Sequence, residues 1–221
     1  MMRKSLFVCA AALLVISPAA RCVADESVKS ARSTNSPSAF TLAKEGNRYI
    51  GEQAKDKVVQ IRSERSSGGI NPNVWYVVYH DDTAALKATE VKFKDGKMVD
   101  VKRPLRLLQA TGHKSDPLPK EKLKIDSDEA LKIASKQSAL ENVKLTSTEM
   151  RLERGPGDDP VWKTRLWASG SKEPGHETSI GDITISAVDG KVVEADVKPE
   201  KVNDQPNIKT EDQPKSEDQS K

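Results

Sequence analysis

The stretch that decides the fold is Val161–Ala168, which reads VWKTRLWA and leads downstream to the turn sequence Asp189-Gly190-Lys191. The same order occurs earlier in the chain, where Val74-Trp75 opens an alternating apolar run that leads to Asp95-Gly96-Lys97. Two copies of one supersecondary unit account for this repetition. The sequence therefore predicts two related structural blocks.

The first block covers residues 38–103. Its opening segment has apolar residues at helix-like spacing from Phe40 to Ala54, although Gly46 interrupts the stripe. Four strands are then expected, at Lys57–Arg65, Val74–His80, Lys87–Lys94 and Lys97–Arg103.

The second block covers residues 125–199 and starts with a clearer helix. Asp126 is a suitable N-cap, and Glu129 follows three residues later. Four strands are expected here as well, at Val143–Arg154, Val161–Ala168, Gly181–Val188 and Lys191–Lys198.

Strict alternation along these strands places apolar side chains on one face and polar ones on the other, as in an antiparallel sheet covered on one side. Asp95-Gly96 and Asp189-Gly190 are typical two-residue hairpin turns. The predicted fold is thus α+β, with two tandem repeats, each of one helix packed on a mostly antiparallel four-stranded sheet.

Three further segments lie outside the two blocks. Residues 25–37 form a polar lead-in, and residues 104–124, which contain three prolines, are a linker. Residues 200–221 repeat an acidic-Gln theme with only two aliphatic side chains, so we predict a disordered tail.

Residues 1–24 are typical of a signal peptide. A positive start at Arg3 and Lys4 precedes a short apolar run, and cleavage after Ala24 has small residues in the right places. The run is too short to span a bilayer, so no stable membrane span is expected after cleavage. Two alternatives to cleavage after Ala24 remain open. One is a lipid anchor at Cys22, and the other is an uncleaved membrane stub. The predicted location is periplasmic or secreted.

Cleavage would change the charge and the cysteine content. It removes three cations and no acid, so the formal charge falls from +3 to zero. Without a basic excess, nucleic acid is not expected as a partner. Both cysteines, Cys9 and Cys22, lie in the removed segment, which leaves no thiolate for catalysis or metal binding.

No set of residues in the sequence converges on catalysis. The histidines His80, His113 and His176 are scattered and lack metal-ligand spacing. The pairs Asp81-Asp82 and Asp158-Asp159 sit at expected strand ends, where aspartates mostly form turns. We therefore predict no enzyme, no catalytic residue, no cofactor and no metal.

A surface for a protein partner is the remaining candidate site. Trp75 and Trp162 are expected in the core, whereas Trp167 points to the opposite face together with Lys163 and Arg165. Aromatic side chains among cations on an exposed sheet face are typical of protein-binding surfaces. Packing of this face against another part of the chain is an equally open alternative. The candidate partner-binding residues are Tyr76, Lys163, Arg165 and Trp167.

The second block resembles a PepSY domain. The resemblance rests on the helix Ser127–Ala134, which reads SDEALKIA, and on Ala187–Val193, which reads AVDGKVV. In the first block only Phe93–Val99 matches, and its helix lacks the Glu-Ala signature. The resemblance implies a non-catalytic module of the bacterial cell envelope, of a kind that also occurs in propeptides that restrain peptidases.

Two functions follow as expectations. The first is an exported, non-catalytic module that binds a protein partner, for which a peptidase that it restrains is one candidate. The alternative is a structural or sensory cell-envelope protein that binds no peptidase.

Overall fold

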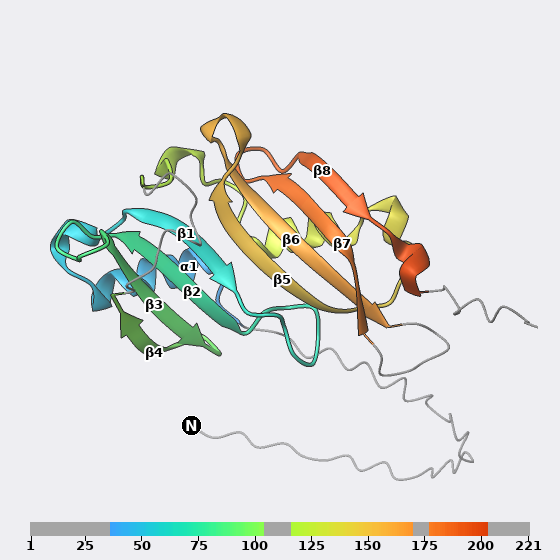
Figure 1. The fold of residues 1–221 in the computed structure, drawn as a ribbon, viewed down its shortest axis with the longest axis horizontal. Helices are drawn as coiled ribbons and strands as arrows, with labels where there is room; N and C mark the ends of the chain where they lie inside the picture. The colour runs from blue at the N-terminus through green and yellow to red at the C-terminus, as the bar shows by residue number, and fades with distance from the viewer. Residues whose placement is uncertain (1–35, 104–115, 170–176, 203–221) are drawn as a thin grey trace, which may run out of the picture. The chain divides into compact units, whose positions relative to one another are not determined.

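The computed structural model describes residues 36–103, 116–169 and 177–202. Within them, eight strands form one antiparallel sheet in the order β4-β3-β2-β1-β5-β6-β7-β8 (Figure 1). The strands are β1 (Val58–Ser63), β2 (Val74–His80), β3 (Ala88–Lys94), β4 (Lys97–Lys102), β5 (Leu145–Arg154), β6 (Pro160–Ser169), β7 (Glu177–Ser186) and β8 (Val192–Val197).

Several predicted features lie outside the described residues. These are the signal peptide at 1–24, nearly all of the polar lead-in, both cysteines, His113, His176, the first part of the linker and the tail from residue 203.

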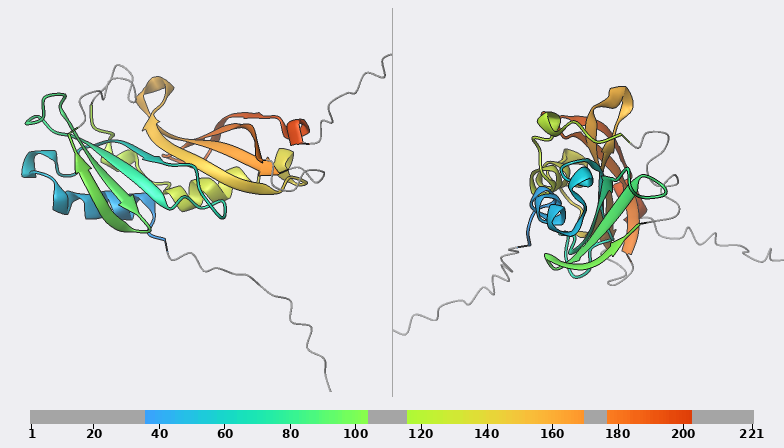
Figure 2. Two further views of the ribbon diagram at one scale, coloured as in Figure 1. Left: turned by 60° about the horizontal axis from the view of Figure 1, so that its bottom comes forward. Right: turned by 90° about the vertical axis from the view of Figure 1, so that its left-hand side faces the viewer.

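Two short α-helices, α1 (Ala39–Gly46) and α3 (Ser127–Ser135), lie on the same side of the sheet (Figure 2). The predicted N-cap of α3 is confirmed, since Asp126 caps it. Short 3-10 helices complete the described elements: η1 (Asn47–Tyr49), η2 (Glu52–Ala54), η3 (Lys120–Lys122), η4 (Ser138–Leu140), η5 (Pro156–Asp158) and η6 (Pro199–Val202).

The N-terminal ends of the two helices meet at one pair of side chains. The Asp126 carboxylate accepts hydrogen bonds from the backbone N–H groups of Ser127, at 2.7 Å, and Phe40, at 3.1 Å. The Ser127 hydroxyl oxygen accepts a third bond, from the Ala39 N–H at 3.0 Å. N–H groups in the first turn of a helix have no partner within it, so these side chains satisfy donors of both helices.

One hydrophobic core runs beneath both helices. Trp75 on β2 and Trp162 on β6 are buried with their ring centroids 6.4 Å apart, and Phe40 of α1 lies 6.2 Å from Trp162. The core prediction for the two tryptophans is confirmed. Leu42 of α1 and Leu131 of α3 belong to the same buried cluster.

The prediction of two tandem repeats, each with its own helix on its own four-stranded sheet, is wrong. The described chain is a largely β fold with one eight-stranded sheet and two short helices. The physical reason is that β1 and β5 pair antiparallel, through Ile61 opposite Leu152 and Arg62 opposite Arg151. This pairing turns two expected sheet edges into the centre of one sheet.

The seam between β1 and β5 is short, and serine side chains extend it. Beyond the two paired positions, the Ser63 hydroxyl oxygen accepts the Met150 N–H at 2.9 Å. Further along, the Ser66 N–H donates to the Thr148 carbonyl at 2.7 Å, and the Ser66 hydroxyl oxygen accepts the Thr148 N–H at 2.8 Å. Hydroxyl groups thus satisfy buried backbone donors where the strands separate.

The two predicted hairpin turns differ in the structure. Asp95 and Gly96 both have positive φ, 49° and 77°, and join β3 to β4 as a two-residue turn. The prediction for Asp189-Gly190 is wrong, because β7 already ends at Ser186 and only Gly190 has positive φ. There the Gly190 N–H donates to the Ser186 carbonyl at 3.0 Å, which closes a longer loop.

Candidate interaction face

The face of the sheet opposite α1 and α3 is polar and carries all four predicted partner-binding residues. Tyr76 lies on β2, and Lys163, Arg165 and Trp167 alternate with the buried residues of β6. No helix of the described residues packs against this face, which is turned toward the viewer in Figure 1. We call it the open face. Near one end of β1 to β3 it also carries a small buried cluster of Val59, Val78 and Ala88.

The strand register places a row of cations across the middle of the open face. Consecutive positions in this row pair directly from one strand to the next, with side chains on the same face. The row, which we call the cross-strand row, runs Asp100, Lys92, Tyr76, Arg62, Arg151, Lys163, Thr184 and Glu194. Four cations and one aromatic ring occupy its centre.

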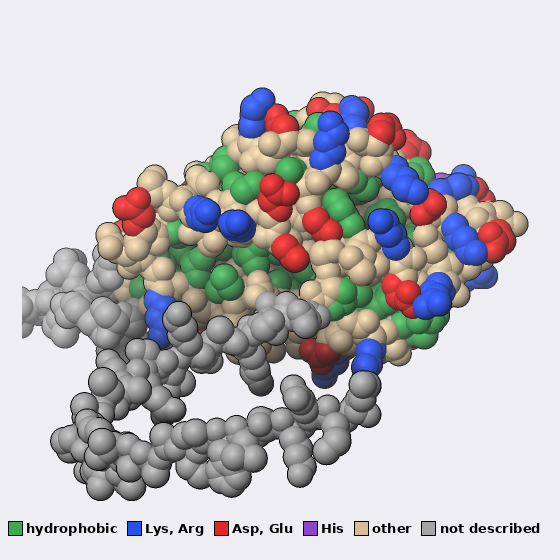
Figure 3. Space-filling model, turned by 180° about the vertical axis from the view of Figure 1, so that it is seen from behind, with side chains coloured by type: hydrophobic (Ala, Val, Ile, Leu, Met, Phe, Trp, Pro, Cys, Tyr) green, Lys and Arg blue, Asp and Glu red, His purple; other side chains and the backbone are tan. Residues whose placement is uncertain are grey.

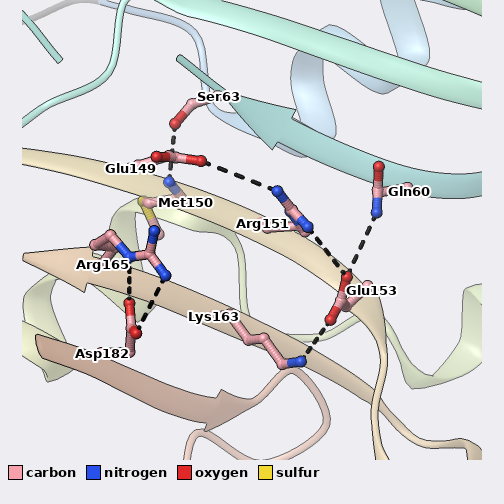
Figure 4. A network of polar contacts seen from close by, with 9 residues as sticks. All are labelled: Gln60, Ser63, Glu149, Met150, Arg151, Glu153, Lys163, Arg165 and Asp182. Atoms are coloured by element: carbon pink, nitrogen blue, oxygen red, sulfur yellow. Dashed lines mark hydrogen bonds and ion pairs between the residues drawn. The ribbon is translucent and has the colours of Figure 1, made fainter. Parts of the chain in front are cut away.

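Acidic side chains beside the row compensate these cations. Glu153 of β5 lies 2.6 Å from Lys163, accepts a hydrogen bond from Gln60 at 3.4 Å and lies 4.0 Å from Arg151 (Figure 4). Arg62 lies 2.7 Å from Glu90. Because each cation has an acidic neighbour, the row is a network of ion pairs and not a free basic stripe.

Tyr76 lies between two cations of the cross-strand row. The Arg62 guanidinium is 4.1 Å and the Lys92 ammonium 4.9 Å from its ring centroid, both within cation–π range. Its hydroxyl donates a hydrogen bond to Glu64, which also pairs with Lys92 at 3.0 Å. The hydrogen bonds from Tyr76 and Lys92 hold the pKa of Glu64 below its usual value. The ring is therefore fixed in place but partly exposed.

Trp167 is covered by an arginine from a distant part of the chain. The Arg65 guanidinium lies 4.6 Å from the Trp167 ring, and its Nε donates to the Ser147 hydroxyl at 2.8 Å. Arg65 also pairs with Glu177 at the start of β7. The side chain thus reaches from the end of β1 across β5 to β6. The sequence analysis placed Trp167 on one face with Lys163 and Arg165 and did not predict this contact.

Arg165 forms a two-point ion pair with Asp182 on β7. Its Nε and Nη2 donate to the two carboxylate oxygens at 2.8 and 3.4 Å. The hydrogen bonds that Arg165 donates to Asp182, together with the negative charge of that carboxylate, raise the pKa of Arg165 above its usual value. Such paired geometry orients both side chains. Lys163, Arg165 and Asp182 also line a shallow polar hollow of about 410 Å³ over β5 to β8.

The structure places the four predicted residues on one face but not in one cluster. β1 and β5 separate Tyr76 from Lys163 in the cross-strand row, which corresponds to roughly 14 Å at the usual strand spacing. Arg165 and Trp167 lie further along β6. Sequence reasoning missed Arg62, Arg65 and Arg151, because their positions follow from the β1–β5 pairing, for which no local signal exists.

Two other residues considered for catalysis, His80 and Asp81, bond to neighbouring residues at the end of β2 and in the turn that follows. His80 lies at the end of β2, with Nε2 2.9 Å from an Asp82 carboxylate oxygen. Asp81 is buried and accepts hydrogen bonds from the Thr83 N–H, at 3.0 Å, and the Thr83 and Thr89 hydroxyls, both at 2.6 Å. It is therefore the turn-forming residue that its position predicts.

Two absences hold for the described parts of the chain. Residues 36–103, 116–169 and 177–202 contain no group of three or more His, Cys, Asp or Glu side chains placed to hold a metal ion. In the same ranges no helix has the length and apolar character that crossing a membrane requires.

Comparison with known proteins gives no relative. No model of a protein family matches the sequence, and neither the curated proteins nor the solved structures contain a significant match.

Proposed function

We propose that this protein is an exported, non-catalytic module that acts by binding a protein partner through the open face. The observation that supports the proposal most is the pair of partly exposed aromatic rings, Tyr76 and Trp167, each held beneath an arginine on a face that no described helix covers. Tyr, Trp and Arg are the residues most enriched at protein interfaces.

The ion pairs around the two rings favour a partner-binding role for this face over that of an ordinary solvent-exposed surface. Arg62, Arg65 and Arg165 are each fixed by a carboxylate, so less side-chain freedom is lost when a partner docks. The mixed charges of the face suit a partner surface that also carries both signs, because a strongly anionic partner would meet Glu149, Glu153 and other acids beside every cation.

The resemblance to PepSY domains identifies the partner class to test, an exported peptidase. Restraint of a peptidase by binding would be stoichiometric, since the protein would occupy the enzyme without turnover. In this proposal the open face contacts the peptidase, and its arginines and aromatic rings supply the binding energy.

The test is a crosslinking pull-down from cell-envelope extract, followed by titration of each recovered peptidase with the purified protein. We expect a saturable loss of peptidase activity near one equivalent. Trp167→Ala should weaken capture and inhibition by about tenfold or more, as for an aromatic hot spot. Tyr49→Ala is the matched control. Tyr49 is an exposed aromatic residue of η1 and lies on the helix-bearing side of the sheet, where its ring packs against Phe93.

Two results would contradict the proposal. Equal capture by wild type and Trp167→Ala, with loss in Tyr49→Ala, would move the interface to the other side of the molecule. Capture of no partner from any envelope fraction would favour the structural or sensory alternative.

A further inference from the structure

A second concave site lies on the helix-bearing side of the sheet, away from the open face. It is a pocket of about 330 Å³ between the residues just before α1, the helix α3 and the loop that joins β1 to β2. This volume is at the lower end of the range for small-molecule sites. Figure 3 shows the molecule from this side, where hydrophobic side chains lie between charged ones.

The floor of the pocket is apolar and well packed. Pro72, Trp75, Leu131 and Met150 all line it while being buried in the core. An indole ring, a thioether and branched carbon chains form a surface that suits a flat ring or an aliphatic side chain. Trp75 is held in orientation, since its Nε1–H donates to the Pro72 carbonyl at 3.2 Å.

The rim carries one carboxylate and one ammonium group. Asp128 and Lys132 lie one turn apart on α3, and both line the pocket. Among the described residues, no ion pair within 4.0 Å joins either of them to a partner or to each other. This contrasts with the open face, where the charged side chains are paired. Desolvation and the neighbouring Asp126 carboxylate raise the pKa of Asp128, although the Ser127 hydroxyl donates a hydrogen bond to Asp128 at 3.2 Å.

We propose that this pocket binds a free α-amino acid with an aromatic or large aliphatic side chain. The side chain occupies the floor formed by Trp75, Leu131 and Met150. The α-ammonium group pairs with Asp128, and the α-carboxylate pairs with Lys132. A ligand with both charges on one carbon and an apolar group beside them matches the apolar floor and the two rim charges, which form no ion pair within the described residues.

The inference does not rest on the proposed function, because it concerns the opposite side of the sheet and different residues. The two can therefore fail separately. Loss of partner capture in Trp167→Ala says nothing about the pocket, and loss of amino-acid binding in Asp128→Asn says nothing about the open face.

The experiment is a titration of the full chain with L-phenylalanine, followed by calorimetry and by NMR of the three tryptophan indole N–H signals. We expect saturable binding that shifts the Trp75 signal and leaves that of Trp167 unchanged. N-acetyl-phenylalanine lacks the ammonium group and phenylalaninamide lacks the carboxylate. The affinity for each should therefore be lower than that for phenylalanine by at least about tenfold.

Variants of α3 provide the matched comparison. Asp128→Asn and Lys132→Met should each lower the affinity for phenylalanine by about tenfold, because each removes one charged partner. Asp128→Asn should no longer distinguish phenylalanine from N-acetyl-phenylalanine. Glu129→Gln on α3 and Lys136→Met at its C-cap remove equivalent charges outside the pocket and should leave the affinity unchanged.

Clear results would overturn the inference. These are no saturable binding at millimolar phenylalanine, a shift of Trp167 in place of Trp75, or equal affinity for phenylalanine and its two one-charge analogues. Circular dichroism of each variant shows whether the fold is kept. If Asp128→Asn unfolds, the affinities of the wild-type protein for phenylalanine and its two one-charge analogues still test the proposal.

Discussion

Two tryptophans on the same strand have opposite roles. Trp162 is fully buried, contacts Phe40 and Trp75, and donates its Nε1–H to the Ile125 carbonyl at 2.8 Å. Trp167 lies on the open face beneath Arg65. The five-residue separation along β6 changes the face, because successive side chains of a strand alternate.

We expect Trp162→Ala to lower the free energy of unfolding by about 3–5 kcal/mol, as for other buried aromatic residues. Trp167→Ala should cost less than about 1 kcal/mol, since it loses only one partly exposed cation–π contact. Urea unfolding of both variants, followed by circular dichroism, measures the difference. Equal losses would show that both faces of β6 are buried.

Asp81 makes folding stability depend on acid pH. Burial alone would raise the pKa of its carboxyl group, but the hydrogen bonds from Thr83 and Thr89 outweigh burial and lower the pKa below its ordinary value. A folded-state pKa below that of the unfolded chain means that the unfolded state binds the proton more readily. The stabilisation is therefore complete above the ordinary carboxyl pKa and is lost as the pH falls through the folded-state pKa.

The corresponding variant is Asp81→Asn. At neutral pH it should unfold more easily than wild type by about 1–3 kcal/mol, because a buried acceptor of three hydrogen bonds is replaced by a neutral amide. The gap should narrow as the pH falls into the acid range, where the wild-type carboxylate is protonated. Glu129→Gln, at an exposed position of α3, is the control. A gap that stays constant with pH would contradict this account.

At the scale of elements, the glycine in α1 is explained by the strand beneath it. A Cβ atom at Gly46 would lie 2.0 Å from the Tyr79 hydroxyl oxygen, and that ring is fully buried on β2. The hydroxyl donates to the Ala43 carbonyl at 2.6 Å, which ties the strand to the helix. Close approach of helix and sheet thus requires glycine where helix propensity alone would favour alanine.

We expect Gly46→Ala to destabilise the protein by about 1–3 kcal/mol, as overpacking does, although alanine is ordinarily the better helix former. Adding Tyr79→Phe removes the clashing oxygen, so the double variant should lose less than the sum of the two single changes. Gly51→Ala is the control, since its added Cβ would meet only Gln53 at 3.6 Å. Thermal melts of the four variants test the coupling.

The limits of seven strands were predictable to within two residues, whereas β7, expected to begin at Gly181, begins at Glu177. Strand pairing was not predictable. Val74–His80 is found with the predicted limits, because its alternation and flanking turn residues are encoded locally. The pairing of β1 with β5 has no such signal. Gln60 is buried in β1, and Arg62 lies opposite Arg151, a like-charge pair that sequence reasoning would disfavour. Only the acids at Glu90, Glu149 and Glu153 make this pair tolerable.

The candidate sites show the same limit. Tyr76 and Trp167 were placed on the polar face from alternation alone, but Arg65 is far from Trp167 in the sequence and close only after folding. The pocket combines Trp75, Asp128 and Met150 from three distant elements. Periodicity assigns a residue to a face, whereas a site depends on which distant residues share that face.

At the scale of the whole molecule, the described residues share one sheet and one large buried cluster. The β1–β5 seam is continuous with the core, because Trp75 and Trp162 contact each other across it. We therefore expect a single cooperative unfolding transition, with the same midpoint by tryptophan fluorescence and by circular dichroism. Two separate transitions would show that the two groups of four strands are energetically independent.

The serines of the seam make this expectation testable by mutation. Ser66→Ala and Ser63→Ala each leave a buried backbone N–H without its acceptor, at Thr148 and Met150, and should each cost about 1–3 kcal/mol. Ser135→Ala, which removes an exposed hydroxyl from α3, should stay within about 0.5 kcal/mol. If the seam couples the sheet, the transition shifts to lower urea concentration without splitting.

A fragment that ends at residue 103 should not fold, because it exposes Ile61 and Trp75, which β5 and Trp162 cover in the intact chain.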